Sequence, residues 1–129
     1  MQGLHLTADL RGCDPAQALM TDPAALRHRC VAAVAEAGLG AVAELFHRFT
    51  PAVAGEPSGI TGVVLLAESH LAIHTWPELG GVTLDVYVCN YGADNSAKAE
   101  HLMDALIAAF APGEVQCQVL RRGQGASAP

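Results

Sequence analysis

The sequence predicts an α+β fold, a two-layer sandwich in which a mainly antiparallel sheet carries two helices on one face. Two segments have apolar residues at helical spacing, and several short segments are dense in apolar and β-branched residues. The links in the middle of the chain are too short for crossover connections, which favours antiparallel pairing. Two helices cover only one face of such a sheet. The other face needs a partner, so we predict a homodimer.

The first half of the chain contains a strand, a helix and a second strand. Residues 3–10 alternate loosely between apolar and polar side chains, as a half-buried strand does. Asp22 followed by Pro23 predicts a helix start, because Asp caps helices well and Pro fits the first helical position. The buried stripe of this helix consists of Leu26, Cys30, Val34 and Ala37. Two glycines end the helix, and residues 41–49 form the next strand.

The second half begins with a loop, continues with three closely spaced strands and ends with a helix and a strand. Pro, Gly and Ala dominate residues 50–59, which predicts the loop. The three strands are Ile60–Glu68, His70–Trp76 and Val82–Cys89. Asn95 caps the second helix. The buried side of that helix consists of Leu102, Met103, Leu106 and Phe110. Residues 115–120 form the last strand.

Length and composition restrict the class of protein. One domain is expected over residues 1–122, with a disordered tail over residues 123–129. The net charge of -6 argues against nucleic acid, and no apolar stretch approaches the roughly 20 residues that span a membrane. The cysteines are widely spaced, which indicates reduced thiols in the cytoplasm. Three of them, Cys13, Cys30 and Cys117, are expected to be small buried hydrophobes.

Reactive side chains concentrate in residues 67–78, Ala-Glu-Ser-His-Leu-Ala-Ile-His-Thr-Trp-Pro-Glu, and a thiol, Cys89, ends the next strand. A serine hydrolase needs a nucleophilic serine, a histidine base and an orienting acid. The strand-to-helix elbow GxSxG is absent around Ser69, so the segment does not favour that class.

The histidines of this segment allow a metal site as an alternative. His70 and His74 point to the same side of a strand, because their separation is even. With His47 or Cys89 they would make a plausible ligand set, although the spacing is not diagnostic of a metal. Taken alone, the histidines are best explained as residues capping the edge of a β-hairpin.

The run over residues 59–78, GITGVVLLAESHLAIHTWPE, resembles the core of the prokaryotic S-adenosylmethionine decarboxylase family. Phe-His-Arg-Phe at 46–49 and Asp-Val-Tyr-Val-Cys at 85–89 add to the match. The resemblance implies a self-cleaving, pyruvoyl-dependent decarboxylase. Its product would be decarboxylated S-adenosylmethionine, the aminopropyl donor for spermidine and polyamine biosynthesis. The resemblance implies no metal and no pyridoxal phosphate.

The resemblance also assigns the cleavage site. The Ser69 hydroxyl would attack the Glu68 carbonyl, and elimination would leave a β chain of residues 1–68 and an α chain of residues 69–129. The α chain would begin with the pyruvoyl group, which forms a Schiff base with the substrate amine. Because a peptide is normally more stable than its ester, the folded site must strain or polarise the scissile carbonyl.

Three further residues match catalytic positions of the family. His74 matches the processing base, Thr61 aligns with a serine that assists processing, and Cys89 aligns with the proton donor. Ser69 and His74 are an odd number of residues apart. On a flat strand they face opposite sides, and they meet only if the chain turns or bulges near Glu68.

The resemblance gives less detail about the substrate. Phe49 would stack on an adenine, Glu78 would bind the ribose or attract the sulfonium, and Trp76 would pack beneath the site. The sequence departs from the family at Leu79-Gly80-Gly81, where Tyr-Gly-Tyr is common after Pro-Glu, and at Asn90, where Gly is common. The loop over 50–58 is also longer than usual.

These departures leave two alternatives open. The substrate would be arginine or ornithine if the pocket no longer holds an adenine. The chain would be an inactive regulatory paralogue if it only pairs with a catalytic partner. Retention of Ser69, His74 and Cys89 together argues against the second alternative.

Overall fold

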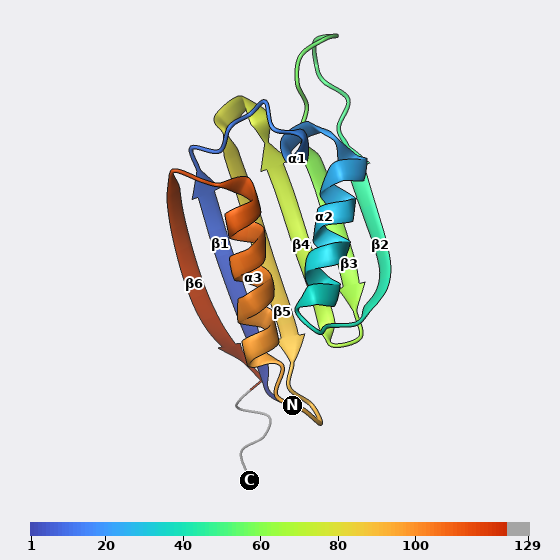
Figure 1. Cartoon of the computed structure of the whole chain (residues 1–129), viewed down its shortest axis with the longest axis vertical. Helices are drawn as coiled ribbons and strands as arrows, with labels where there is room; N and C mark the ends of the chain where they lie inside the picture. The colour runs from blue at the N-terminus through green and yellow to red at the C-terminus, as the bar shows by residue number, and fades with distance from the viewer. Residues whose placement is uncertain (124–129) are drawn as a thin grey trace.

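The computed structural model describes residues 1–123, and residues 124–129 of the predicted tail lie outside that description. Six strands form one sheet in the order β2-β3-β4-β5-β1-β6, with the helices on one side of it (Figure 1). The strands are β1 (Gly3–Arg11), β2 (Ala41–Arg48), β3 (Ile60–Leu66), β4 (Ser69–Trp76), β5 (Gly81–Cys89) and β6 (Glu114–Arg122). The helices are α1 (Ala18–Thr21), α2 (Pro23–Glu36), α3 (Ser96–Phe110) and the short 3-10 helix η1 (Pro77–Leu79).

Every pairing in the sheet is antiparallel, which confirms the predicted α+β fold class. Strands β2 to β5 form a meander in chain order. The connections from β3 to β4 and from β4 to β5 are short, whereas residues 49–59 form a longer loop between β2 and β3. Strand β1 lies between β5 and β6, so the beginning of the chain is enclosed by strands from its second half.

The helices α2 and α3 begin where the sequence predicts, but by different means. The Asp22 carboxylate accepts a hydrogen bond from the Ala24 amide at 3.0 Å, as expected of a cap. Asn95 occupies the cap position of α3, yet the prediction that its side chain caps the helix is wrong. The Asn95 side-chain NH2 group instead donates to the Cys89 carbonyl at 2.9 Å, while the Asp94 carboxylate accepts from the Ser96 backbone amide. The four-residue helix α1 was not predicted.

The core fills the space between the sheet and its helices. The predicted stripe of α2 and the predicted inner side of α3 are both buried. Burial raises the pKa of the Cys30 thiol to about 12, so this group behaves as a protonated hydrophobe at neutral pH. Cys13 is buried as well, but Cys117 is exposed on the edge strand β6, which corrects the prediction for that residue.

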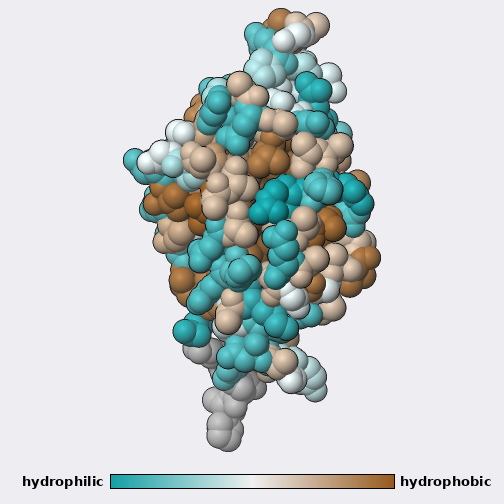
Figure 2. Space-filling view, viewed as in Figure 1, coloured by the Kyte–Doolittle hydropathy of each residue, from teal (hydrophilic) through white to brown (hydrophobic). Residues whose placement is uncertain are grey.

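The two sides of the molecule differ in what they present to solvent. On the helical side, seen in Figure 2, polar and apolar residues are interspersed. The opposite side of the sheet, which we call the open face, carries no helix of residues 1–123 and exposes apolar side chains, among them Leu45 (70%) and Leu65 (48%). Dimerisation through this face remains a prediction. Among the described residues, no helix is long and apolar enough to cross a membrane.

Candidate active site

The predicted cleavage site lies in the turn between β3 and β4. Leu66 pairs with Ser69, so Ala67 and Glu68 form the tip of a tight hairpin. Ser69 has φ 155°, and apart from Ala111 it is the only non-glycine residue with positive φ in the described part of the chain. L-residues rarely adopt such a conformation, and strain of this kind clusters at functional sites. The predicted scissile bond is therefore held in a strained turn.

The carbonyl of the predicted scissile bond accepts a backbone hydrogen bond. The Cys89 amide donates to the Glu68 carbonyl oxygen at 2.7 Å, and the Gly40 amide donates to the Glu68 carboxylate at 3.2 Å. A backbone N–H aimed at this oxygen stabilises negative charge that develops on it during attack. Ser69 pairs with Val88, the residue before Cys89. The turn and the end of β5 thus form one unit.

A cavity of about 400 Å³ adjoins this unit. Its lining consists of Met1, Ala67, Glu68, Cys89, Tyr91 and Asn95. Asn90, which follows Cys89, stabilises the rim of this cavity, because its side-chain oxygen accepts a hydrogen bond from the Asn95 backbone amide at 2.9 Å. The cavity therefore joins the Glu68 side of the predicted cleavage site to the thiol predicted to donate a proton.

The predicted processing residues lie at the other end of β4. Thr61 pairs with His74 across β3 and β4, and its hydroxyl lies 3.2 Å from His74 Nδ1. His74 is five residues from Ser69, roughly 16 Å along a strand at about 3.3 Å per residue. The register of β4 on β5 is continuous from Ser69 onward, so no bulge turns the two side chains toward each other. Within one chain, Ser69 and His74 do not meet.

The predicted substrate-binding residues gather beside His74. They line a cavity of about 500 Å³ that contains Phe49, Thr61, His74, Trp76 and Glu78 together with the base of the β2–β3 loop. This loop projects beyond the sheet (Figure 1), and two bonds close its base: the Phe49 amide donates to the Gly59 carbonyl at 3.0 Å, and Arg48 donates to Ser58 at 3.1 Å. Phe49 is 51% exposed. An aromatic face is thus available to a ligand.

Within the described residues, one group has the spacing of metal ligands, and it is not the predicted set. It consists of His5, His70 and Asp85 on the open face. His70 belongs to both sets, while His74, His47 and Cys89 lie outside the observed group. The sequence reading missed His5 and Asp85. A charged residue in the middle of an otherwise apolar strand is the signal that marks Asp85.

Comparison with known proteins gives a consistent result. The family model described as S-adenosylmethionine decarboxylase matches residues 4–123. The S-adenosylmethionine decarboxylase proenzyme of Aquifex aeolicus is 40% identical over 121 residues, 94% of this chain and 81% of that protein. The proenzyme of Pyrococcus furiosus is 34% identical over 109 residues, 84% of this chain and 73% of that protein. The crystal structure of the Aquifex aeolicus adenosylmethionine decarboxylase superimposes with a TM-score of 0.80, covering 94% of this chain and 90% of the other.

Proposed function

The chain belongs to the S-adenosylmethionine decarboxylase family, and on that premise we propose that it cuts itself between Glu68 and Ser69 and then decarboxylates S-adenosylmethionine. The product is the aminopropyl donor for polyamine synthesis. The relatives above carry the decarboxylase name in both a bacterium and an archaeon. That agreement favours S-adenosylmethionine over arginine or ornithine, and an active enzyme over a regulatory paralogue. The cytoplasmic location is part of the proposal.

The self-cleavage follows from the groups around the scissile bond. The Ser69 hydroxyl attacks the Glu68 carbonyl carbon, the C–N bond breaks, and the peptide becomes an ester with a free Ser69 amine. Removal of the Ser69 α-proton then breaks the Cβ–O bond and releases Glu68 as a carboxylate. The dehydroalanine at position 69 takes up water and loses ammonia, which leaves the pyruvoyl group.

One observation carries this proposal: the 2.7 Å hydrogen bond from the Cys89 amide to the Glu68 carbonyl oxygen, at a turn where Ser69 has positive φ. Attack on the carbonyl places negative charge on this oxygen, and a donor already in position stabilises it. The strain at Ser69 raises the free energy of the intact peptide relative to the ester. Formation of a pyruvoyl group from Ser69 requires both features.

In our proposal, the base that removes the Ser69 α-proton is His74 of a second copy of the chain. His74 lies roughly 16 Å along β4 from Ser69, too far to take its proton within one chain. Two open faces packed about a two-fold axis that crosses the middle of β4 would bring the Ser69 end of one copy near the His74 end of the other. The exposed apolar side chains of the open face support this arrangement. Each site is incomplete without its partner.

The cavity beside His74 suits the proposed substrate. Phe49 stacks on the adenine, and the Glu78 carboxylate attracts the sulfonium or binds the ribose. Trp76 is 37% exposed and lies 5.8 Å from His74 between ring centroids, so it packs at the rim of this cavity. The pyruvoyl carbonyl, once formed, supplies the electron sink for loss of carbon dioxide. Cys89 then delivers the proton that replaces the lost carboxylate.

Intact-mass measurement tests the proposal directly. Purified protein should consist of two fragments that meet at Glu68 and Ser69, with the second fragment blocked by a pyruvoyl group. The Ser69→Ala variant should stay at full length, whereas Ser96→Ala, a serine at the start of α3, should be cut as the wild type is. Carbon dioxide release should occur with S-adenosylmethionine and not with arginine or ornithine. A full-length wild-type chain that is fully active would overturn the proposal.

A further inference from the structure

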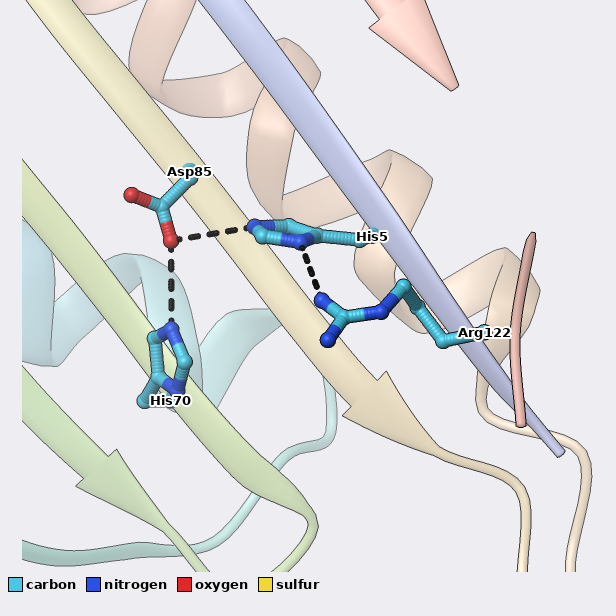
Figure 3. Close-up of polar contacts among 4 residues, drawn as sticks. All are labelled: His5, His70, Asp85 and Arg122. Atoms are coloured by element: carbon cyan, nitrogen blue, oxygen red, sulfur yellow. Dashed lines mark hydrogen bonds and ion pairs between the residues drawn. The ribbon is translucent and has the colours of Figure 1, made fainter. Parts of the chain in front are cut away.

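Four polar side chains form a continuous chain across the open face (Figure 3). Arg122 of β6 lies 3.1 Å from His5 Nδ1, and His5 Nε2 lies 3.3 Å from Asp85 Oδ1. The same Asp85 oxygen lies 3.1 Å from His70 Nε2. We call Arg122, His5, Asp85 and His70 the polar relay. It runs through β6, β1 and β5 to β4, and it ends on the residue that follows Ser69.

Arg122 determines which ring nitrogen of His5 donates a hydrogen bond and which accepts one. A guanidinium only donates hydrogen bonds, so His5 Nδ1 must accept and the His5 proton sits on Nε2. That Nε2–H donates to Asp85, and His70 Nε2–H donates to the same carboxylate oxygen. Tyr87 lies within the same group: its ring is 5.4 Å from the His5 ring and 5.1 Å from the Arg122 guanidinium carbon. Donation therefore converges on the Asp85 carboxylate, from Arg122 through His5 on one side and from His70 on the other.

We propose that the polar relay positions residue 69 for decarboxylation by anchoring the side chain of His70. This inference rests on the proposed function. Self-cleavage removes the covalent link to Glu68 and turns residue 69 into a chain end, and chain ends fray unless they are tied down. The amide of His70 is bonded to residue 69, so fixing the His70 side chain restricts the reactive end of β4. A displacement of about 1 Å at a reacting group costs up to about 100-fold in rate.

A metal ion at His5, His70 and Asp85 is the competing explanation. The 3.1 and 3.3 Å separations resemble the edges of a tetrahedral zinc site, which are about 3.3 Å. A metal on His5 Nε2 would, however, require the proton on Nδ1, where it would face the Arg122 donor. The geometry therefore favours the relay, and metal content becomes an outcome of the test.

The experiment uses the self-cleaved enzyme with both of its chains present. We expect Asp85→Ala and His5→Leu to lower kcat about 10- to 100-fold, with KM within about twofold of wild type, because substrate binding lies elsewhere. His5→Gln keeps a donor toward Asp85 and should recover most of kcat. The matched controls Asp104→Ala and His101→Leu, both on the exposed side of α3, should leave kcat unchanged.

A second measurement does not depend on activity. Nitrogen-15 spectra of histidine-labelled protein should show His5 as the Nε2–H tautomer, and Arg122→Leu should convert it to a mixture of tautomers. An unchanged kcat in Asp85→Ala, a loss that tracks only the folded fraction, or stoichiometric metal whose removal abolishes activity would each overturn the relay. An uncut and inactive wild type would overturn the proposed function instead, while the tautomer result would still stand.

Discussion

The two ends of β4 are built differently. At the Ser69 end, the key contacts are backbone hydrogen bonds and strand pairing: the Cys89 amide contacts the scissile carbonyl, and Ser69 pairs with Val88. At the His74 end, side chains line a cavity, and one wall of this cavity is a loop that projects from the sheet. The first end can hold one bond in a strained geometry, and the second can adapt to a ligand.

This difference indicates how the two reactions are divided. Self-cleavage needs a single rigid geometry, which a paired strand end supplies. Substrate binding, as proposed, needs an open pocket with an aromatic and an acidic group, and the cavity lined by Phe49 and Glu78 offers both. Roughly 16 Å of strand separates the two ends, and this separation is the reason for proposing that two copies complete each site.

The largest expected effect comes from mixing two inactive chains. Ser69→Ala lacks the nucleophile and His74→Ala lacks the base, so each should stay uncut when expressed alone. Expressed together with different tags, the His74→Ala chain should be cut, because its Ser69 meets His74 of the other chain. Intact mass of each tagged chain reads the result. An uncut mixture would contradict the two-copy arrangement.

The next largest effect is expected for Cys89→Ser, a substitution that distinguishes self-cleavage from decarboxylation. Cys89→Ser keeps the backbone amide that contacts Glu68 but replaces the thiol, so cleavage should remain detectable. Turnover should fall about 100-fold, the contribution typical of a positioned general acid. Steady-state kinetics on the cleaved variant measures this. Cys117→Ser, at an exposed thiol on β6, serves as the control, and normal turnover in Cys89→Ser would remove the proton-donor role.

A smaller effect is expected in the loop cavity. Phe49→Leu and Glu78→Gln should each raise KM about tenfold, the equivalent of one lost contact, and leave cleavage unchanged. Val53→Ala, an exposed apolar residue of the same loop outside the cavity lining, should leave KM as it is. Equal effects at all three positions would indicate that the loop matters only for stability.

The smallest effect tests the Thr61–His74 contact. Thr61→Ser keeps the hydroxyl and removes the methyl that stiffens the side chain, so cleavage should speed up roughly threefold. Thr61→Val removes the hydroxyl beside His74 Nδ1 and should slow cleavage. A time course of fragment formation compares the three chains. Equal rates would show that this contact plays no part in processing.

Much of the fold was predictable because local signals agree with tertiary packing. Asp22-Pro23 begins a helix, Gly-rich segments end elements, and the apolar stripes of α2 and α3 are buried. Asn95 does not cap α3 through its side chain; its side-chain NH2 group donates instead to the Cys89 carbonyl, a tertiary contact that the local sequence does not reveal. Cys117 is exposed because β6 is an edge strand, and edge position depends on the order of the sheet.

The sequence motif proposes residues for the site, and these assignments remain predictions; the geometry of the site could not be read from the sequence. The motif points to Ser69, His74 and Cys89. The odd number of residues between Ser69 and His74 correctly predicts that these two side chains do not meet within one strand. The sequence does not show that the register of β4 stays regular, which rules out a bulge. Asp85 and His5 belong to strands 80 residues apart in the chain, so their contact depends on the insertion of β1 beside β5.

That insertion determines what would become of the two fragments after the proposed cut. Residues 1–68 contribute β1, β2 and β3, and residues 69–129 contribute β4, β5 and β6, so β1 of one fragment is interlocked between β5 and β6 of the other. The two fragments would dissociate only if the sheet unfolded. Assembly from two separate pieces would need a strand to be threaded into a finished sheet, so the chain must fold whole before it breaks. Refolding after denaturation should consequently be far less efficient for the nicked protein than for the uncut Ser69→Ala chain.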